Sequence, residues 1–183
     1  RMRSLALAAV LVGCAAEARA VIGLSTQIVN VVMENLEPGR SYNLRELRGI
    51  PYTVKNRGDG AVDVIVEVTV PVETEIIEPY EPIPDPTWMQ VVPGRFRLGA
   101  GEPGFSDLII TIPDDKKYVG RHFQAMVWAH TVGTGFMAAG VKSHIRFSVG
   151  KGPETLAEQE RQKAMVELNY DLWPAGLHVM RAR

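Results

Sequence analysis

Cysteine is almost missing from this chain, which has a single one, Cys14, among 183 residues. One cysteine forms no intramolecular disulfide and no cysteine-based zinc site, so the fold must be held by its hydrophobic core. Basic residues show no excess either, since 20 Lys and Arg face 21 Asp and Glu for a formal net charge of −1. Without a basic excess, the electrostatic attraction to phosphates is lost, and we expect no nucleic-acid partner.

The side-chain groupings of common enzymes are also missing. There is no G-x-x-x-x-G-K motif for phosphate binding, and no Cys/His or Ser/His grouping that predicts a nucleophile. His122 and His130 fall on one face of a predicted strand, but eight extended residues separate them by about 26 Å, too far to share a metal. We therefore predict no enzyme activity, no metal and no cofactor.

The first twenty residues have the pattern of a secretory signal peptide, with a short basic start and an apolar run too short to span a bilayer. The sequence contains two alternative processing sites for this signal peptide. Ala18-Arg19-Ala20 is an A-x-A site that would free Val21, and Leu11-Val12-Gly13-Cys14 resembles the bacterial lipobox, in which Cys14 is lipidated. Both predict an extracytoplasmic protein, in the periplasm, at the cell surface or secreted. The signal peptide or a lipid on Cys14 would be its membrane contact.

The clearest structural signal runs from Ile50 to Val70. Every second residue from Val62 to Val70 is valine, and Asp63, Glu67 and Thr69 stand among the residues between them. This period of two is typical of a strand with one buried face. Ile50, Tyr52 and Val54 show the same pattern, and residues 56–60 are rich in turn formers. We therefore predict a β-hairpin over residues 50–70.

Further extended segments surround it, and no helical pattern interrupts them. The predicted strands lie at residues 22–36, 96–98, 108–112, 122–130 and 141–149. Between residues 70 and 88, Pro79, Pro82, Pro84 and Pro86 favour an extended connection that crosses between sheets, with Trp88 anchoring it in the core. Residues 21–150 are thus predicted to form an all-β antiparallel sandwich of about seven strands.

The C-terminal part has a different character. Residues 151–164 are charged helix formers and are predicted to form a helical linker. In residues 165–183, Val166, Leu168, Tyr170 and Leu172 alternate with polar residues, which predicts an additional terminal strand. Because a strand without a partner is unstable, it must fold back on the sandwich, begin a truncated second domain, or pair with another molecule.

Three runs resemble bacterial immunoglobulin-like domains of the pilus-chaperone type. They are V-K-N-R-G-D-G-A-V-D-V-I-V-E-V, W-M-Q-V-V-P-G-R-F-R-L-G-A-G-E and the strand end I-T-I-P, and the resemblance extends over about residues 21–149. It implies a single immunoglobulin-like sandwich. Pilus chaperones have two such domains and an Arg/Lys pair that grips a carboxylate. The first strand here has no arginine, and Lys142 is not assigned as the lysine, so the anchor pair is not evident.

One sheet face is the predicted contact site. Met126 and Trp128 on one strand, and His144 and Arg146 on the last strand, would form an apolar and aromatic patch, with His144 opposite Trp128. The alternative is that the helix at 153–164 or the terminal strand covers this patch. Arg57-Gly58-Asp59 is interpreted as turn chemistry.

These patterns predict an exported, non-enzymatic binding or assembly module of the cell envelope that acts through protein–protein contacts. Residues 166–172 would add as a strand to an exposed sheet edge of another envelope or surface protein, or of a second copy. The alternative is a periplasmic pilus-type chaperone for surface-fibre subunits, which would use the edge of the last strand, residues 141–149.

Overall fold

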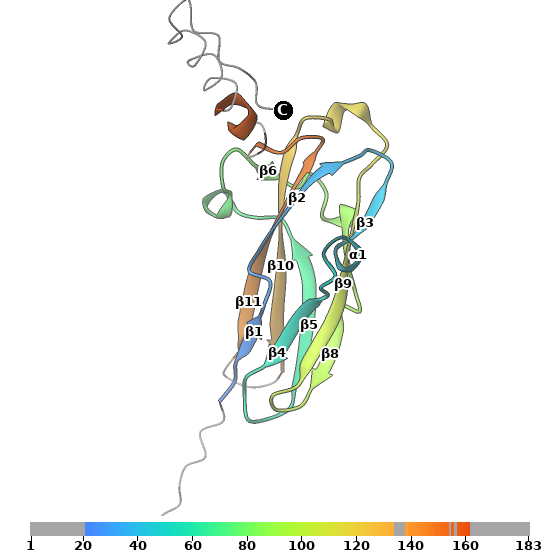
Figure 1. Ribbon diagram of the computed structural model, residues 1–183. Coiled ribbons are helices and arrows are strands. Elements are labelled where there is room, and N and C mark those ends of the chain that lie inside the picture. The colour runs from blue at the N-terminus through green and yellow to red at the C-terminus, as the bar shows by residue number, and fades with distance from the viewer. Residues whose placement is uncertain (1–20, 134–137, 154, 156, 162–183) are drawn as a thin grey trace, which may run out of the picture.

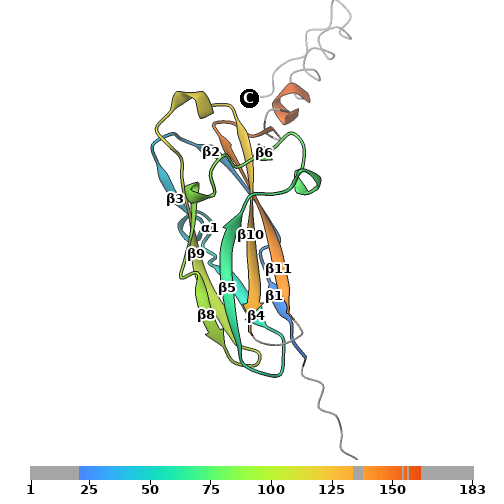
Figure 2. The same ribbon diagram turned by 180° about the vertical axis from the view of Figure 1, so that it is seen from behind.

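The computed structural model describes residues 21–133, 138–153, 155 and 157–161 (Figures 1 and 2). The strands of the first sheet are β1 (Leu24–Thr26), β4 (Tyr52–Asn56), β9 (Pro103–Thr111), β3 (Ser41–Asn43) and β7 (Met89–Val92). Those of the second are β2 (Asn30–Leu36), β11 (Gly140–Val149), β10 (His122–Val132), β5 (Val62–Thr69), β8 (Arg95–Leu98) and β6 (Glu81–Pro82). Short helical turns are α1 (Leu44–Arg48), η1 (Glu73–Glu75), η2 (Pro86–Trp88) and η3 (Lys116–Tyr118). The predicted all-β sandwich is confirmed.

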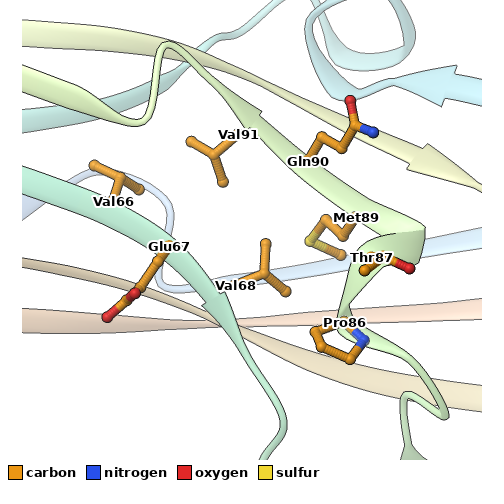
Figure 3. A pocket seen from close by; sticks show the side chains of 8 residues that line it. All are labelled: Val66, Glu67, Val68, Pro86, Thr87, Met89, Gln90 and Val91. Carbon is orange, nitrogen blue, oxygen red and sulfur yellow. The ribbon is translucent and has the colours of Figure 1, made fainter.

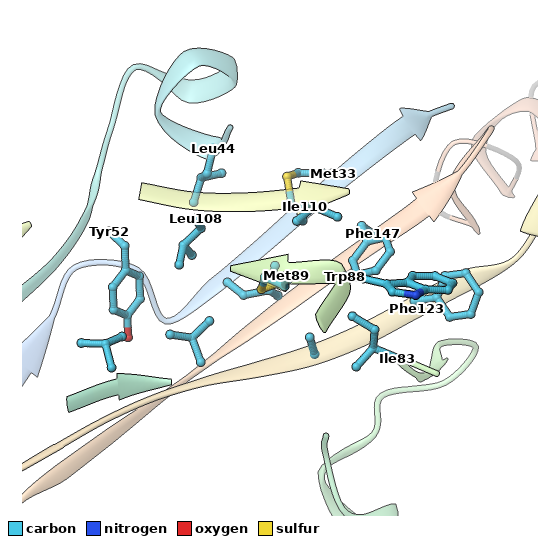
Figure 4. Packing of buried hydrophobic residues seen from close by; sticks show 14 of the residues in the cluster. Met33, Leu44, Tyr52, Ile83, Trp88, Met89, Leu108, Ile110, Phe123 and Phe147 are labelled. Carbon is cyan, nitrogen blue, oxygen red and sulfur yellow. The ribbon is translucent and has the colours of Figure 1, made fainter. Parts of the chain in front are cut away.

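The hydrophobic core lies between the two sheets (Figure 4). The second sheet contributes the residues that the alternation predicted to point inward, Val64, Val66, Phe123, Ala125, Val127, Ala129, Ile145, Phe147 and Val149. The first sheet contributes Tyr52, Val54, Leu108 and Ile110. Trp88 is buried, as predicted, and meets the Phe123 ring edge-on at a centroid distance of 5.4 Å. The large apolar area removed from water stabilises a fold in which the described residues contain no cysteine.

The predicted hairpin over residues 50–70 is wrong. Its two strands form but do not pair: β4 pairs with β1 and β9, whereas β5 pairs with β10 and β8. The chain makes an arch from one sheet to the other, so that the two strands contribute buried residues from opposite sides of the core. The alternating pattern is the same for a hairpin and an arch, because both bury one face of each strand.

Asn56 explains why the chain turns between sheets. Its side chain is completely buried, and its Nδ2 donates hydrogen bonds to the carbonyl oxygens of Gly60 at 2.7 Å, Gly99 at 2.9 Å and Leu98 at 3.3 Å. Its Oδ1 accepts one from the N–H of Gly58 at 2.8 Å. One side chain therefore connects the arch to the turn after β8. It also provides hydrogen-bond partners for backbone groups of the arch that are shielded from water.

The predicted strand over residues 22–36 is divided in two. β1 pairs with β4 in the first sheet, and β2 runs parallel to β11 in the second. Between them the Oγ1 of Thr26 accepts a hydrogen bond from the N–H of Ile28 at 3.2 Å, which stabilises the change of direction.

The proline-rich connection crosses between the sheets, as predicted. After β5 the chain stands away from the sandwich as the green loop that contains η1 in Figure 1, and returns as β6, parallel to β10. It then passes through η2 into β7 of the first sheet. We call residues 70–80 the strap.

At the C-terminal side, the described residues 153, 155 and 157–161 are helical and fall within the predicted linker of 151–164. The Oγ1 of Thr155 is hydrogen-bonded to the Oε2 of Glu34 on β2. The predicted signal peptide, with Cys14, and the predicted terminal strand at 166–172 lie outside the described residues. In the described ranges, no helix has the length and apolar character needed to cross a membrane.

Candidate functional site

The four residues of the predicted patch do share one face of the second sheet, but their register differs from the prediction. His144 lies opposite Met126, and Trp128 lies opposite Lys142. The prediction that His144 faces Trp128 is therefore wrong by two residues. The alternation predicts which residues of each strand share a face. It does not predict which residues lie opposite each other, because that register depends on the length and geometry of the connecting loop.

The strap covers part of this face. Met126 is only 1% exposed, and Gln124 beside it is completely buried. Gln124 accepts a hydrogen bond from the N–H of Ile77 at 3.0 Å through its Oε1, and its Nε2 donates to the carbonyl of Glu75 at 2.7 Å. The cover includes the strap, a segment that the sequence interpretation did not consider for this role.

One further contact fixes the strap in place, and another positions Gln124. The Nζ of Lys142 lies 2.5 Å from the Oε1 of Glu75, and this contact lowers the pKa of the Glu75 carboxyl. The Nδ1 of His144 lies 3.1 Å from the Nε2 of Gln124. Lys142 and His144 thus have partners within the chain, and both Gln124 and Lys142 join the strap to the sheet.

Trp128 and Arg146 are half-buried. The Trp128 ring stacks on His130 at a centroid distance of 4.1 Å, and His130 contacts the Oε1 of Glu67 at 3.0 Å. The guanidinium of Arg146 lies 5.0 Å from the centre of the Tyr80 ring. Both side chains keep some exposed surface for a partner, whereas Met126 has almost none.

A groove of about 390 Å³ opens along one side of the sandwich, between β5 and β7 (Figure 3). Pairing of β5 with β8 ends at Ile65, and one further bond joins the N–H of Val66 to the carbonyl of Gly94 at 2.9 Å. Alternate residues direct their backbone groups to the same side, so Val68 presents its N–H and C=O to the groove. In the described part of the chain, no strand pairs with Val68 on that side.

The floor of the groove is apolar. Val66 and Val68 from β5 point toward Met89 and Val91 from β7, as Figure 3 shows. Val68 and Val91 are only partly buried, which leaves the seam between the two sheets accessible. The groove thus combines an open backbone edge with an apolar floor.

The corresponding opening beside β2, of about 310 Å³, is partly covered by a helix. There α1 lies against the space between the sheets, and the Nη2 of Arg48 donates a hydrogen bond to the carbonyl of Val32 at 2.6 Å. Covering an edge with a helix and a cation is a common protection against unwanted strand pairing. The β5–β7 side has no such cover within the described residues.

Two short motifs have structural roles here. The Oδ1 of Asp59 accepts a hydrogen bond from the N–H of Val21 at 3.1 Å, and the Nε of Arg57 donates to the Oγ of Ser25 at 2.8 Å, so the Arg-Gly-Asp sequence ties the arch to the N-terminal segment. Residues 99–104 spell G-x-G-x-x-G, but they begin at the turn between β8 and β9 instead of leading from a strand into a helix. Over the described ranges, no group of three His, Cys, Asp or Glu side chains is placed to hold a metal ion.

Comparison with known protein families and with curated proteins finds no match. Among solved structures, the chain is similar to PapD-like domain 7 of human CEP192, with 9% identity, a TM-score of 0.49, and coverage of 70% of this chain and 86% of that one. It is similar to the E. coli chaperone DraB, with 19% identity, a TM-score of 0.41, and coverage of 70% and 54%.

A third neighbour is the CsuC–CsuE chaperone–tip adhesion subunit complex of Acinetobacter baumannii, with 11% identity, a TM-score of 0.45, and coverage of 76% of this chain and 64% of that one. The chain spans only 54% of the length of DraB. These neighbours include PapD-like and pilus-chaperone domains, the class that the sequence resembles, and the likeness concerns the fold alone.

Proposed function

We propose that this chain is an exported, non-enzymatic protein-binding module of the cell envelope that receives an extended segment of its partner along the β5–β7 groove. The observation that supports it is the open side of the sandwich, where Val68 offers unpaired backbone groups above an apolar floor. A peptide that adds as a strand gains main-chain hydrogen bonds, and its alternate side chains fill the groove.

The segment proposed as the donor is 166–172 of a second copy or a similar segment of another envelope protein. Its apolar residues Val166, Leu168, Tyr170 and Leu172 alternate with Glu167, Asn169 and Asp171. Such a strand would place one apolar face in the groove and leave a polar face in water. The signal-like residues 1–20 support an extracytoplasmic location, with lipidation at Cys14 or cleavage before Val21 as the two routes.

Two neighbouring valines on β7 provide the test. Val91 lines the groove, whereas Val92 is 51% exposed and does not line it. Binding of a synthetic peptide of residues 165–173 is measured by titration calorimetry. We expect V91K to weaken binding at least about tenfold, since a charge in the apolar seam costs about 1.4 kcal/mol or more. The V92K control should bind like the wild type.

A second measurement follows assembly of the protein itself. Removing residues 165–183 should abolish any self-association that depends on strand donation, as measured by size-exclusion chromatography with light scattering. Equal peptide binding by V91K and V92K would refute the strand-addition proposal, and assembly at high salt that the shortened chain retains would refute strand donation between copies.

A second candidate is a periplasmic chaperone for surface-fibre subunits; DraB is named as a chaperone, and the CsuC–CsuE complex as a chaperone with a tip adhesion subunit of Csu pili. Its support in this chain is the long last strand β11, parallel to β2 at one end. β2 occupies the edge of β11 from His144 to Val149, so only Gly140–Ser143 would be available for a subunit. A V141K substitution should block subunit binding if this role is correct, and V91K should not.

A further inference from the structure

A cleft of about 410 Å³ lies on the outer face of the first sheet, over β1, β4 and β9. Ile50 and Phe105 line it with 49% and 48% of their surface exposed. The cations Lys55 and Arg57 also line it, and no acidic residue does. Its surface is therefore apolar and positively charged.

The two cations have spare binding capacity. The Nζ of Lys55 has no hydrogen-bond or ionic partner among the described residues, and Arg57 makes one side-chain hydrogen bond there, from its Nε to the Oγ of Ser25. The Nη groups of Arg57 thus remain available to a ligand. A matching partner is acidic and carries exposed apolar side chains of its own.

The strap has this composition. The carboxylates of Glu73 and Glu78 have no partner within the described ranges, and Val72 and Ile77 are 59% and 41% exposed. The carboxylate of Glu75, by contrast, is engaged by Lys142 of the same chain. The strap is thus fixed to the sheet at its centre and presents free acidic and apolar groups on either side.

The cleft and the strap lie on opposite sheets. The strap is bonded to the outer face of the second sheet, and the cleft is on the outer face of the first. Figures 1 and 2 show the strap at the end of the sandwich near β6, whereas β1 and β4 reach toward the other end. A strap therefore does not reach the cleft of its own chain.

We infer that the strap of one copy docks in the cleft of the next, so that copies of this protein associate head to tail. Because the two surfaces differ and lie on opposite faces, the association does not close into a two-fold dimer and gives head-to-tail chains or rings. This contact uses none of the residues that line the β5–β7 groove, and it does not depend on the proposed function.

The contact is expected to be weak and sensitive to salt. A loop of about ten residues in one cleft buries less area than a standard interface of about 1,600 Å². Its charged groups are largely exposed, so their attraction falls as the Debye length drops from about 30 Å at 0.01 M salt to about 3 Å at 1 M. Association should be strongest at low ionic strength.

Charge reversal on the full-length chain tests this contact. In the V91K background, which removes strand addition at the groove, K55E/R57E makes the cleft acidic and E73K/E78K makes the strap basic, so each variant alone should sediment as a monomer at low salt. In an equimolar mixture of the two, one variant supplies an intact strap and the other an intact cleft, and association should return to at least half of the extent seen with V91K alone. Sedimentation velocity over a concentration series measures it.

A control with the same change in net charge is R95E/K116E, because both residues are exposed and outside the cleft and the strap. In the same V91K background, it should associate like V91K alone. Melting temperatures verify that each variant is folded. Monomeric V91K protein at low salt, unchanged association when K55E/R57E is added to V91K, or a mixture that stays monomeric would each overturn the inference.

Discussion

Replacing Asn56 by alanine should destabilise the protein more than any exposed polar substitution. The side chain makes short hydrogen bonds to Gly58, Gly60 and Gly99 and a longer one to Leu98. A typical hydrogen bond contributes about 1 kcal/mol net, and a buried group left without a partner costs about 1–3 kcal/mol. Because the bonds to Gly60 and Gly99 are only partly buried, water replaces some of them, and we expect a loss of about 2–4 kcal/mol.

Urea unfolding followed by fluorescence measures this loss as a lower midpoint at an unchanged slope. N30A is the control, since Asn30 is exposed and its Oδ1 accepts one bond from Arg146 at 3.2 Å, so its cost should stay within about 0.5 kcal/mol. N56D keeps the size and the acceptor but turns a negative oxygen toward carbonyl groups, and it should cost at least as much as N56A. A cost for N56A as small as that of N30A would refute the role of Asn56 in holding the arch.

Three further predictions concern the strap, the helix start and the core. Q124A should release the strap, because Gln124 bonds it twice, and hydrogen exchange at the Ile77 amide should become at least tenfold faster. G152A should cost about 1–3 kcal/mol by thermal unfolding, since a Cβ there would meet the Oε1 of Glu34 at 1.6 Å, and adding E34A should recover most of the loss. Burial raises the pKa of Tyr52 above its usual 10.0. The unfolded chain therefore loses that proton first, and stability should fall as the pH rises through about 10 and above in the wild type, less so in Y52F.

The inward faces could be predicted because a strand repeats every two residues. Val64 and Val66, like Phe123 and Val127, are buried as their alternation indicated. That pattern depends only on which side of a strand meets the core, so it is available from a single sequence.

Strand partners could not be predicted in the same way. The run from Asn56 to Gly60 is rich in turn formers, which suit a hairpin or an arch equally well, and the choice depends on distant carbonyls of Leu98 and Gly99. The strap was missed as a cover for a related reason. Its sequence has no periodic pattern of apolar residues. Its two hydrogen bonds to Gln124 join residues that are 47 and 49 positions apart in the sequence.

The groove could be found only from the structure. It lies between β5 and β7 because the pairing of β5 with β8 stops at Ile65, and no local sequence pattern indicates where pairing stops. Alternation in residues 166–172 could predict a donor strand, but not the edge that would receive it.

The two proposed contacts differ in the forces that hold them, and this makes them separable. Strand addition at Val68 depends on main-chain hydrogen bonds and apolar burial, which salt screens little. Docking of Glu73 and Glu78 near Lys55 and Arg57 depends on exposed charges, which salt screens strongly. If both contacts operate, raising the salt concentration should break the head-to-tail contact first and leave the strand-donated species. Association that persists at high salt and disappears with V91K belongs to the groove, and association that disappears at high salt and survives V91K belongs to the cleft and the strap.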